Sequence, residues 1–279
     1  MTSNLVSFEW LSKRLDDKAV RLVDCRFVLG QPDVGASAYQ AEHLPAAVYF
    51  DLERDLSAPI GEHGGRHPLP DLEELARKLG QHGIGNDDQI VAYDDQGGAM
   101  ASRFWWLLKY MGHDKVAVLE GSFTAWKAAG LPTTSEIAPV SATSFTVQSQ
   151  SDMLVQMEEV RTKLGNGETL LIDSREGVRY LGLQEPIDPV AGHIPGAVNH
   201  FWKESLNEDG TWKSAAEQKL RFQALDPERD VIVYCGSGVT ACPNVLALHE
   251  AGHRKVKLYA GSWSDWVSYK ENPIATGEE

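Results

Sequence analysis

A cysteine that opens a glycine-rich loop is the residue in this sequence best suited to nucleophilic chemistry. Cys235 follows the apolar run VIVY (231–234) and begins the segment CGSGVT (235–240). Gly236 and Gly238 let the main chain curl tightly, so that the backbone N–H groups of the segment can converge on the sulfur. Such groups favour a thiolate and would also stabilise a terminal persulfide anion. The segment therefore predicts a reactive cysteine at Cys235.

A helix is expected directly after this loop. The run VLALHEAG (245–252) has helical character, and Pro243 falls in the first turn, where its missing N–H costs least. The positive N-terminal end of that helix would further favour a thiolate. Cys242 lies two helical turns beyond Cys235 and is predicted to be a core residue. With Cys25 as the third and last cysteine, the chain has neither a disulfide framework nor a CxxC-type zinc site.

The loop belongs to one of two copies of the same sequence pattern. Four pairs of segments match in the same order: VRLVDCR with TLLIDSR, EHLPAAVYF with GHIPGAVNH, QIVAYD with DVIVYC, and GHDKVAVLEGSFTAW with GHRKVKLYAGSWSDW. Between the copies, EIAPVSATSFTVQSQS has no helical period and is typical of an extended linker. We predict a first domain over residues 1–138, a linker over 139–151 and a second domain over 152–279.

Both copies alternate β-branched runs with helix-like stretches. Helices are expected within 72–83 and 103–113, and strands at 21–23, 90–92, 116–119, 170–172, 231–234 and 256–258. This alternation predicts an α/β fold in which each domain is a parallel β-sheet with helices on both faces. Ligands of such sheets bind at the C-terminal ends of the strands, and Cys235 lies at one of them.

What the copies share is expected to be scaffold, and what they do not share indicates function. Asp-x-Arg, His-x-Pro and Gly-Ser-x-x-x-Trp occur in both, and the Asp and Arg of the first pattern are predicted to form a buried charge pair. The first copy has Asp94 where the second has Cys235, and Gly30 where the second has Arg179. The second domain is therefore predicted to carry the reaction.

These motifs together resemble the two-domain rhodanese-type sulfurtransferases over essentially the whole chain. The resemblance is carried by the duplication, Asp-x-Arg, GHIPGA (192–197), CGSGVT (235–240) and GSWSDW (261–266). It implies that Cys235 takes a sulfane sulfur from a small-molecule donor, becomes a persulfide and passes the sulfur to cyanide, a thiol or thioredoxin. It implies no metal and no organic cofactor.

The loop also resembles one subgroup of that family. Thiosulfate-preferring members resemble Cys-Arg-Lys-Gly-Val-Thr, whose two cations hold a dianion, whereas Cys-Gly-Ser-Gly-Val-Thr resembles the 3-mercaptopyruvate members. Mercaptopyruvate is therefore the favoured donor, and thiosulfate is the competing one. The resemblance implies that Ser237 bonds the developing charge or relays a proton, and that the donor is bound by Gly236, Gly238, Val239 and Thr240.

A donor carboxylate needs a cation, and Arg179 lies where the family has its substrate-binding arginine. Members of this type carry a second arginine a few residues later, but LGLQEPIDPVAGH (181–193) contains none. In the first half, His67 of GGRHPLP matches a family histidine that reaches the active site across the domain interface and assists proton transfer. Arg66, beside it, is a candidate for the missing cation.

Two other functions are weighed against this one. The related cell-cycle phosphatases need an arginine six residues after the cysteine to hold phosphate, and position 241 is Ala241. A non-catalytic binding or sulfur-carrier module is favoured by Asp94 in the first half and opposed by Cys235 in the second.

Composition sets the remaining limits. The 279 residues are 42% hydrophobic and 24% charged, which is typical of a globular protein with ample core-forming residues. The net charge of −14 argues against nucleic acid or an anionic membrane as partner. The N-terminal sequence lacks a signal-peptide pattern, and no run of about eighteen apolar residues occurs. We therefore expect a cytoplasmic enzyme.

Overall fold

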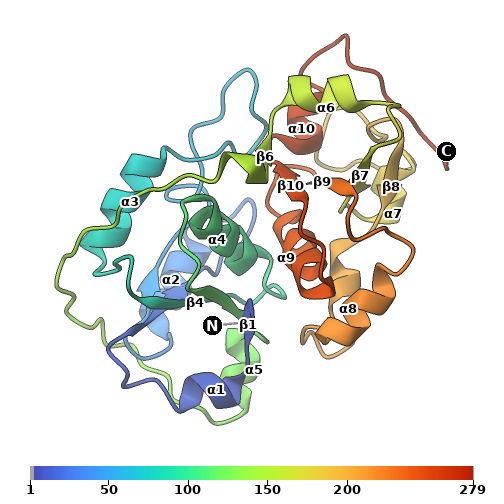
Figure 1. Ribbon diagram of the computed structural model, residues 1–279. Coiled ribbons are helices and arrows are strands. Elements are labelled where there is room, and N and C mark those ends of the chain that lie inside the picture. Colours follow the sequence, from blue (N-terminus) through green and yellow to red (C-terminus); the bar gives the residue numbers. More distant parts are fainter. Residues whose placement is uncertain (1–2, 279) are drawn as a thin grey trace. The chain divides into compact units, whose positions relative to one another are not determined.

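The structure, a computed structural model, describes residues 3–278 and divides into two compact units (Figure 1). The first unit consists of the chain up to Ala58, Pro70–Gln150 and Leu206–Trp212. The second consists of Pro59–Leu69, Ser151–Ser205 and the chain from Lys213. Each unit thus includes one short segment from the opposite half of the chain, here called the 59–69 segment and the 206–212 segment.

The first unit contains a five-stranded parallel sheet in the order β1-β5-β4-β2-β3. Its strands are β1 (Leu5–Val6), β2 (Val20–Asp24), β3 (Val48–Tyr49), β4 (Gln89–Tyr93) and β5 (Val116–Leu119). Its helices are α1 (Phe8–Ser12), α2 (Val34–Ala41), α3 (Leu72–Gln81), α4 (Ala99–Tyr110) and α5 (Phe123–Ala128).

The second unit repeats this order as β6-β10-β9-β7-β8, again all parallel. Its strands are β6 (Leu154–Val155), β7 (Thr169–Asp173), β8 (Ala197–Asn199), β9 (Asp230–Tyr234) and β10 (Val256–Tyr259). Its α-helices are α6 (Met157–Lys163), α7 (Gly177–Tyr180), α8 (Ala215–Arg221), α9 (Cys242–Ala251) and α10 (Ser262–Trp266), and its 3₁₀ turns are η1 (Ser151–Met153) and η2 (Trp202–Ser205). The prediction of two α/β domains with helix-covered parallel sheets is confirmed.

Local sequence explains where these elements begin and end. Each of the six predicted strands lies within an observed strand, because largely buried runs with β-branched residues suit the interior of a parallel sheet. Helix α3 begins where the Asp71 side chain accepts the Glu74 N–H. Helix α9 has Pro243 in its first turn and ends at Gly252, whose φ of 100° suits glycine. The edge strands β1, β3, β6 and β8 are only two or three residues long and escaped prediction.

The shared Asp-x-Arg pattern forms the predicted buried charge pair in both units. Asp24 accepts Arg26 at 2.6 Å, and Asp173 accepts Arg175 at the same distance. Each guanidinium also donates to a main-chain carbonyl at 2.6 Å, that of Glu42 or Gly192. Removing one member of such a pair would leave a buried charge unpaired, at a cost of about 3–5 kcal/mol.

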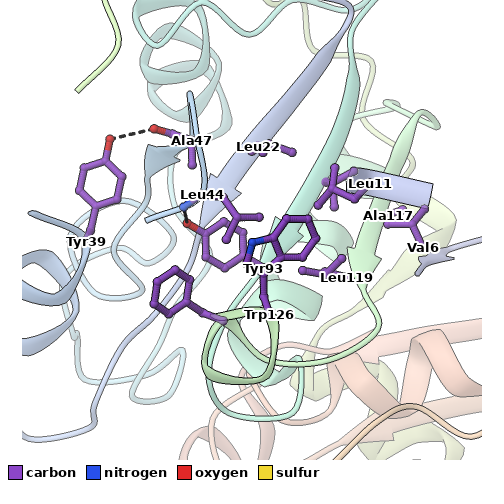
Figure 2. Packing of buried hydrophobic residues seen from close by; sticks show 12 residues of the cluster. Val6, Leu11, Leu22, Tyr39, Leu44, Ala47, Tyr93, Ala117, Leu119 and Trp126 are labelled. Carbon is purple, nitrogen blue, oxygen red and sulfur yellow. Dashed lines mark hydrogen bonds between the residues drawn. The ribbon is translucent and has the colours of Figure 1, made fainter. Parts of the chain in front are cut away.

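The core of the first unit shows how the sheet is fixed (Figure 2). Tyr93 at the end of β4 is fully buried; its hydroxyl accepts the Leu44 N–H at 3.1 Å and donates to Asp24 at 2.8 Å. Trp126 and Leu22 belong to the same cluster. The equivalent core of the second unit includes Tyr234, directly before Cys235. Close packing at this point holds the end of the central strand rigid.

The stretch predicted as a linker runs in extended form along the first unit. No helix or strand is assigned between Ala128 and Ser151, and the stretch is held by hydrogen bonds such as Thr143 N–H to Gly80 O at 2.9 Å and Gln148 N–H to Met111 O at 2.9 Å. Glycine is needed at positions 80 and 112, because a Cβ there would meet the linker backbone or side chains.

Candidate active site

Cys235 lies directly after β9, the central strand of the second sheet, and the loop from 235 to 241 leads into α9. Its backbone N–H donates to the Ser262 hydroxyl at 3.1 Å, and its carbonyl accepts the Trp263 N–H at 2.9 Å. Only 1% of the residue is exposed. The nucleophile predicted from sequence is therefore held on both sides of its Cα and screened from bulk water.

Ser262 holds the cysteine in place through a strained backbone. It has a φ of 57°, in the left-handed region that residues other than glycine rarely adopt. Its buried hydroxyl donates to the Tyr259 carbonyl at 2.9 Å while accepting the Cys235 N–H. Strain of this kind persists only where surrounding contacts fix it, and it is common at functional sites.

The two loop glycines serve different purposes. Gly238 has a φ of 75°, and a Cβ there would collide with the Ala260 carbonyl, so both conformation and space require glycine. Gly236 has no positive φ. A Cβ on Gly236 would lie 2.9 Å from Arg66 Nη2 and 3.5 Å from Arg179 Nη2. Two guanidinium groups thus lie against the residue that follows the nucleophile.

The matching loop of the first unit binds a carboxylate through its backbone N–H groups. Asp94 follows the central strand β4, and its carbonyl accepts the Phe123 N–H as that of Cys235 accepts the Trp263 N–H. Its buried carboxylate accepts four backbone N–H groups at 2.8–2.9 Å, from Gln96, Gly98, Met100 and Ala101. Burial raises the pKa of Asp94, while these four bonds lower it. The convergence of N–H groups on the Cys235 sulfur itself stays a prediction.

The 59–69 segment brings Arg66 and His67 to the Cys235 loop. His67 Nδ1 lies 2.8 Å from the Ser237 hydroxyl, and both residues are buried. The last copy of the Gly-Ser-x-x-x-Trp motif anchors this segment, because Asp265 accepts the Gly64 N–H at 2.7 Å and the Ser264 hydroxyl accepts the Arg66 N–H at 3.1 Å.

The same motif in the first copy lacks these two anchors. Thr124 and Ala125 stand where the second copy has Ser264 and Asp265. The first unit instead includes the 206–212 segment, whose Trp212 ring packs against Gly98: a Cβ on Gly98 would lie 3.0 Å from the indole Nε1. The motif therefore belongs to the core of both units, and in the second unit it also anchors the 59–69 segment.

Two carboxylates pair with the arginines beside Gly236. Arg179 donates to Glu185 at 2.6 and 3.0 Å and to Asp188 at 3.1 Å. Asp188 also accepts Arg66, so that its carboxylate bridges both guanidinium groups. Glu185 is further held by Arg175 at 3.2 Å.

Arg66 keeps bonding capacity after this pairing. Within residues 3–278, its guanidinium makes a hydrogen bond to Asp188 alone, and its Nε atom is buried without a partner. Burial lowers the pKa of Arg66, the Cys235 sulfur opposes that effect, and the neighbouring Arg179 adds to it. A partly buried cation with unused N–H groups is suited to receive an anion.

The structure thus gathers the residues predicted from the loop and the two candidate cations. Ser237, Gly236, Arg179, His67 and Arg66 all surround the start of the Cys235 loop, with Val239 buried and Thr240 half-buried further along it. Cys242 is buried, and its thiol donates to the Gly238 carbonyl at 3.3 Å. Cys25 lies buried in the first unit, where burial and then the charge of Asp24 raise its pKa.

Sequence reasoning missed the two carboxylates and three residues of the GSWSDW motif. Asp188 and Glu185 stand in the sequence of the stretch 181–193, which contains no arginine, but the sequence does not show which side chains they pair with. Ser264 and Asp265 could have been found, because they differ between the two copies as Cys235 and Asp94 do. Nothing in the sequence marks the backbone of Ser262.

Residues 3–278 contain neither a helix that could cross a membrane nor a cluster of metal-ligating side chains. No helix in this range has the length and apolar character needed to span a bilayer. The same residues bring together no group of three His, Cys, Asp or Glu side chains that could hold a metal ion.

Comparison with known proteins agrees with the arrangement of this site. The rhodanese-like domain family matches residues 7–129 and 156–269. A protein of Pseudomonas aeruginosa described as "Probable 3-mercaptopyruvate sulfurtransferase" is 44% identical, over 99% of both chains. The thiosulfate sulfurtransferase of Rattus norvegicus is 35% identical, over 94% of this chain and 91% of its own. The crystal structure of the 3-mercaptopyruvate sulfotransferase SseA from Escherichia coli superposes with a TM-score of 0.82 at 31% identity, covering 94% of this chain and all of that one. The duplicated sheet with a cysteine loop in its second copy is thus the fold of these enzymes, and the chain belongs to the rhodanese-like family as a two-domain sulfurtransferase.

Proposed function

We propose that this enzyme transfers the sulfur of 3-mercaptopyruvate, through a persulfide on Cys235, to a thiophilic acceptor. The observation that carries the proposal is the pair of guanidinium groups beside Gly236. Arg66 and Arg179 come from different halves of the chain and together supply the two cations that an α-keto carboxylate can bond. The relatives named for mercaptopyruvate support the same choice of donor.

In the first half-reaction the Cys235 thiolate attacks the sulfur of the donor. A sulfur–sulfur bond forms, the carbon–sulfur bond of the donor breaks, and its electron pair passes to carbon 3 as the enolate of pyruvate. The proton of the donor thiol ends on that carbon, so that pyruvate leaves and Cys235 remains as a persulfide anion. Atoms and charge balance without an external oxidant or reductant.

Ser237 and His67 supply a path for that proton. Their side chains are hydrogen-bonded at 2.8 Å and both are buried, so the pair can hand a proton from the donor sulfur toward the enolate without exchanging it with bulk water. The loop N–H groups stabilise the persulfide anion in this account, and the four N–H groups that Asp94 receives in the first unit support that assignment. Gly236, Gly238, Val239 and Thr240 form the wall of the donor site.

In the second half-reaction the acceptor attacks the outer sulfur of the persulfide. The sulfur–sulfur bond breaks and its electron pair returns to Cys235, which restores the thiolate. Cyanide would leave as thiocyanate, and a thiol or thioredoxin would leave as its persulfide. We propose the cytoplasm as the compartment, supported by the three cysteines, all of which are free.

The test is a comparison of two sulfur donors on one preparation. Thiocyanate formation from cyanide gives kcat/KM for 3-mercaptopyruvate and for thiosulfate. We expect a preference for mercaptopyruvate of about tenfold or more, which equals roughly 1.4 kcal/mol of transition-state stabilisation. A preference for thiosulfate would make the enzyme a thiosulfate sulfurtransferase. Turnover of neither donor would favour a carrier of sulfur received from another protein.

A further inference from the structure

Asp188 occupies an unusual position in the charge network of the proposed site. Its side chain is 2% exposed, and its two oxygens bond two different arginines, Arg66 and Arg179. Both arginines present their Nη2 atoms to Gly236, where a bound donor would lie next to Cys235. The Asp188 carboxylate is therefore about one guanidinium width from the donor.

The charges of this network cancel before any donor binds. Three cations face three carboxylates through contacts of 3.2 Å or less: Arg66, Arg175 and Arg179 with Asp173, Glu185 and Asp188. The two loop positions after the nucleophile, Gly236 and Ser237, add no charge. A donor that approaches the Cys235 thiolate thus meets two arginines whose charge is already partly neutralised.

We propose that Asp188 is a specificity-determining residue, which positions Arg66 and Arg179 and restricts the site to donors that carry a single negative charge. The inference rests on the proposed function and extends it to the charge of the donor. Asp188 does not touch the reacting atoms, and it acts through the two guanidinium groups.

The physical basis is the unequal repulsion of a monoanion and a dianion. At an effective dielectric constant of about 20, a unit charge roughly 6 Å away changes the affinity for each donor charge by up to about a hundredfold. Thiosulfate carries one more negative charge than mercaptopyruvate does through its carboxylate. Partial solvent access to Arg66, whose side chain is 26% exposed, weakens the field, so we expect about a tenfold discrimination.

The experiment measures the ratio of kcat/KM for thiosulfate to that for 3-mercaptopyruvate in wild type, Asp188→Asn and Asp188→Glu. We expect the ratio to rise about tenfold in Asp188→Asn, mainly through a lower KM for thiosulfate, and to stay near the wild-type value in Asp188→Glu, which keeps the charge. Loss of packing alone would lower kcat/KM for both donors and leave their ratio unchanged.

Asp226→Asn is the matched control, because it removes the same charge from an exposed site. Asp226 lies four residues before β9, and the five residues of that strand, roughly 16 Å in length, separate its start from Cys235. Its ratio should equal that of the wild type. An unchanged ratio in Asp188→Asn, or a shift of Asp226→Asn by the same factor, would overturn the inference.

A measurement on the wild type keeps the inference testable if Asp188→Asn does not fold. Pyruvate and oxalate are similar in size and differ by one charge, so inhibition by each reports the same discrimination. We expect pyruvate to inhibit more strongly, and stronger inhibition by oxalate would contradict the role of Asp188. Failure of the wild type to use mercaptopyruvate would instead refute the proposed function, while the comparison of inhibitors would still decide the charge preference.

Discussion

Arg66 gives the sharpest test of the donor site, because sequence alone made it only a candidate for the second cation. Replacing Arg66 with alanine removes a guanidinium whose Nη2 lies against Gly236 and whose Nε has no partner within the described residues. A hydrogen bond between charged groups contributes about 1.5–3 kcal/mol. Because Arg66 is partly exposed and already pairs with Asp188, we take about 2 kcal/mol, which corresponds to a loss of roughly 30-fold in kcat/KM for mercaptopyruvate.

The loss should fall mostly on KM. A carboxylate remote from the breaking bond is held equally in the ground state and the transition state, and removing such uniform binding raises KM with little change in kcat. Arg66→Lys keeps the charge but not the planar fork, so it should lose less than Arg66→Ala. Arg229→Ala is the control, since Arg229 lies in the second unit and its side chain, within residues 3–278, donates only to the carbonyls of Gly167 and Glu168.

The assay is thiocyanate formation over a range of mercaptopyruvate concentrations at saturating cyanide. A loss of less than about threefold in Arg66→Ala, or an equal loss in Arg229→Ala, would show that Arg66 does not bind the donor. A fall in kcat with KM unchanged would instead assign Arg66 to the chemical step.

Three further predictions concern stability and positioning. Asp94→Ala leaves three buried N–H groups and one half-buried N–H group without their acceptor and should lower the free energy of unfolding by about 2–4 kcal/mol in urea denaturation; a change under about 1 kcal/mol would contradict the anion-holding role of that loop. Burial, and then the charge of Arg221, lower the pKa of His200 to about 4, whereas in the unfolded chain its pKa is about 6.5. Below pH 6.5 the unfolded chain therefore binds a proton that the folded protein does not bind. The contribution of neutral His200 to the free energy of unfolding is complete above pH 6.5 and is lost as the pH falls toward 4. His200→Gln should therefore reduce the loss of unfolding free energy between pH 7 and pH 4.5 by about 2–3 kcal/mol, and an unchanged pH dependence would refute this. Asp265→Ala removes the acceptor of the Gly64 N–H and should raise KM for mercaptopyruvate several-fold, whereas Cys235 should still form a persulfide at saturating donor; complete loss of the persulfide would mean that Asp265 supports the nucleophile itself.

The fold could be predicted from sequence because its signals are local. Runs such as Val231–Tyr234 are long enough and sufficiently β-branched to specify buried parallel strands, and the duplication doubles each observation. The edge strands could not be predicted, because two residues such as Leu5–Val6 carry no period.

The site could be predicted from the sequence only where its functional residues lie next to one another in a short segment. Cys235 and its glycines form one motif, and the contrast with Asp94 pointed to the second half. Arg66 lies 169 residues before Cys235 (235 − 66), and its place beside Gly236 depends on the 59–69 segment joining the second unit. Contacts of this kind come from tertiary packing, which no local pattern encodes.

The pairing of Asp188 with two arginines is a second contact that could not be predicted from the sequence. A sequence search for positive charge in the stretch 181–193 finds none and suggests an incomplete site. The structure instead places acids there that hold arginines from elsewhere. Arg66 lies beside Gly236 and pairs with Asp188 of this stretch, so we propose it as the second donor-binding cation.

Measurement of intact mass shows whether Cys235 is the residue that carries the transferred sulfur. Wild type, Cys235→Ser, Cys25→Ser and Cys242→Ser are each incubated with mercaptopyruvate without an acceptor, and the modified residue is located by peptide mapping. We expect the gain of one sulfur atom in wild type, Cys25→Ser and Cys242→Ser, mapped to Cys235 and removed by cyanide, and no gain in Cys235→Ser. A cyanide-removable sulfur that persists in Cys235→Ser would show that another residue carries the sulfur.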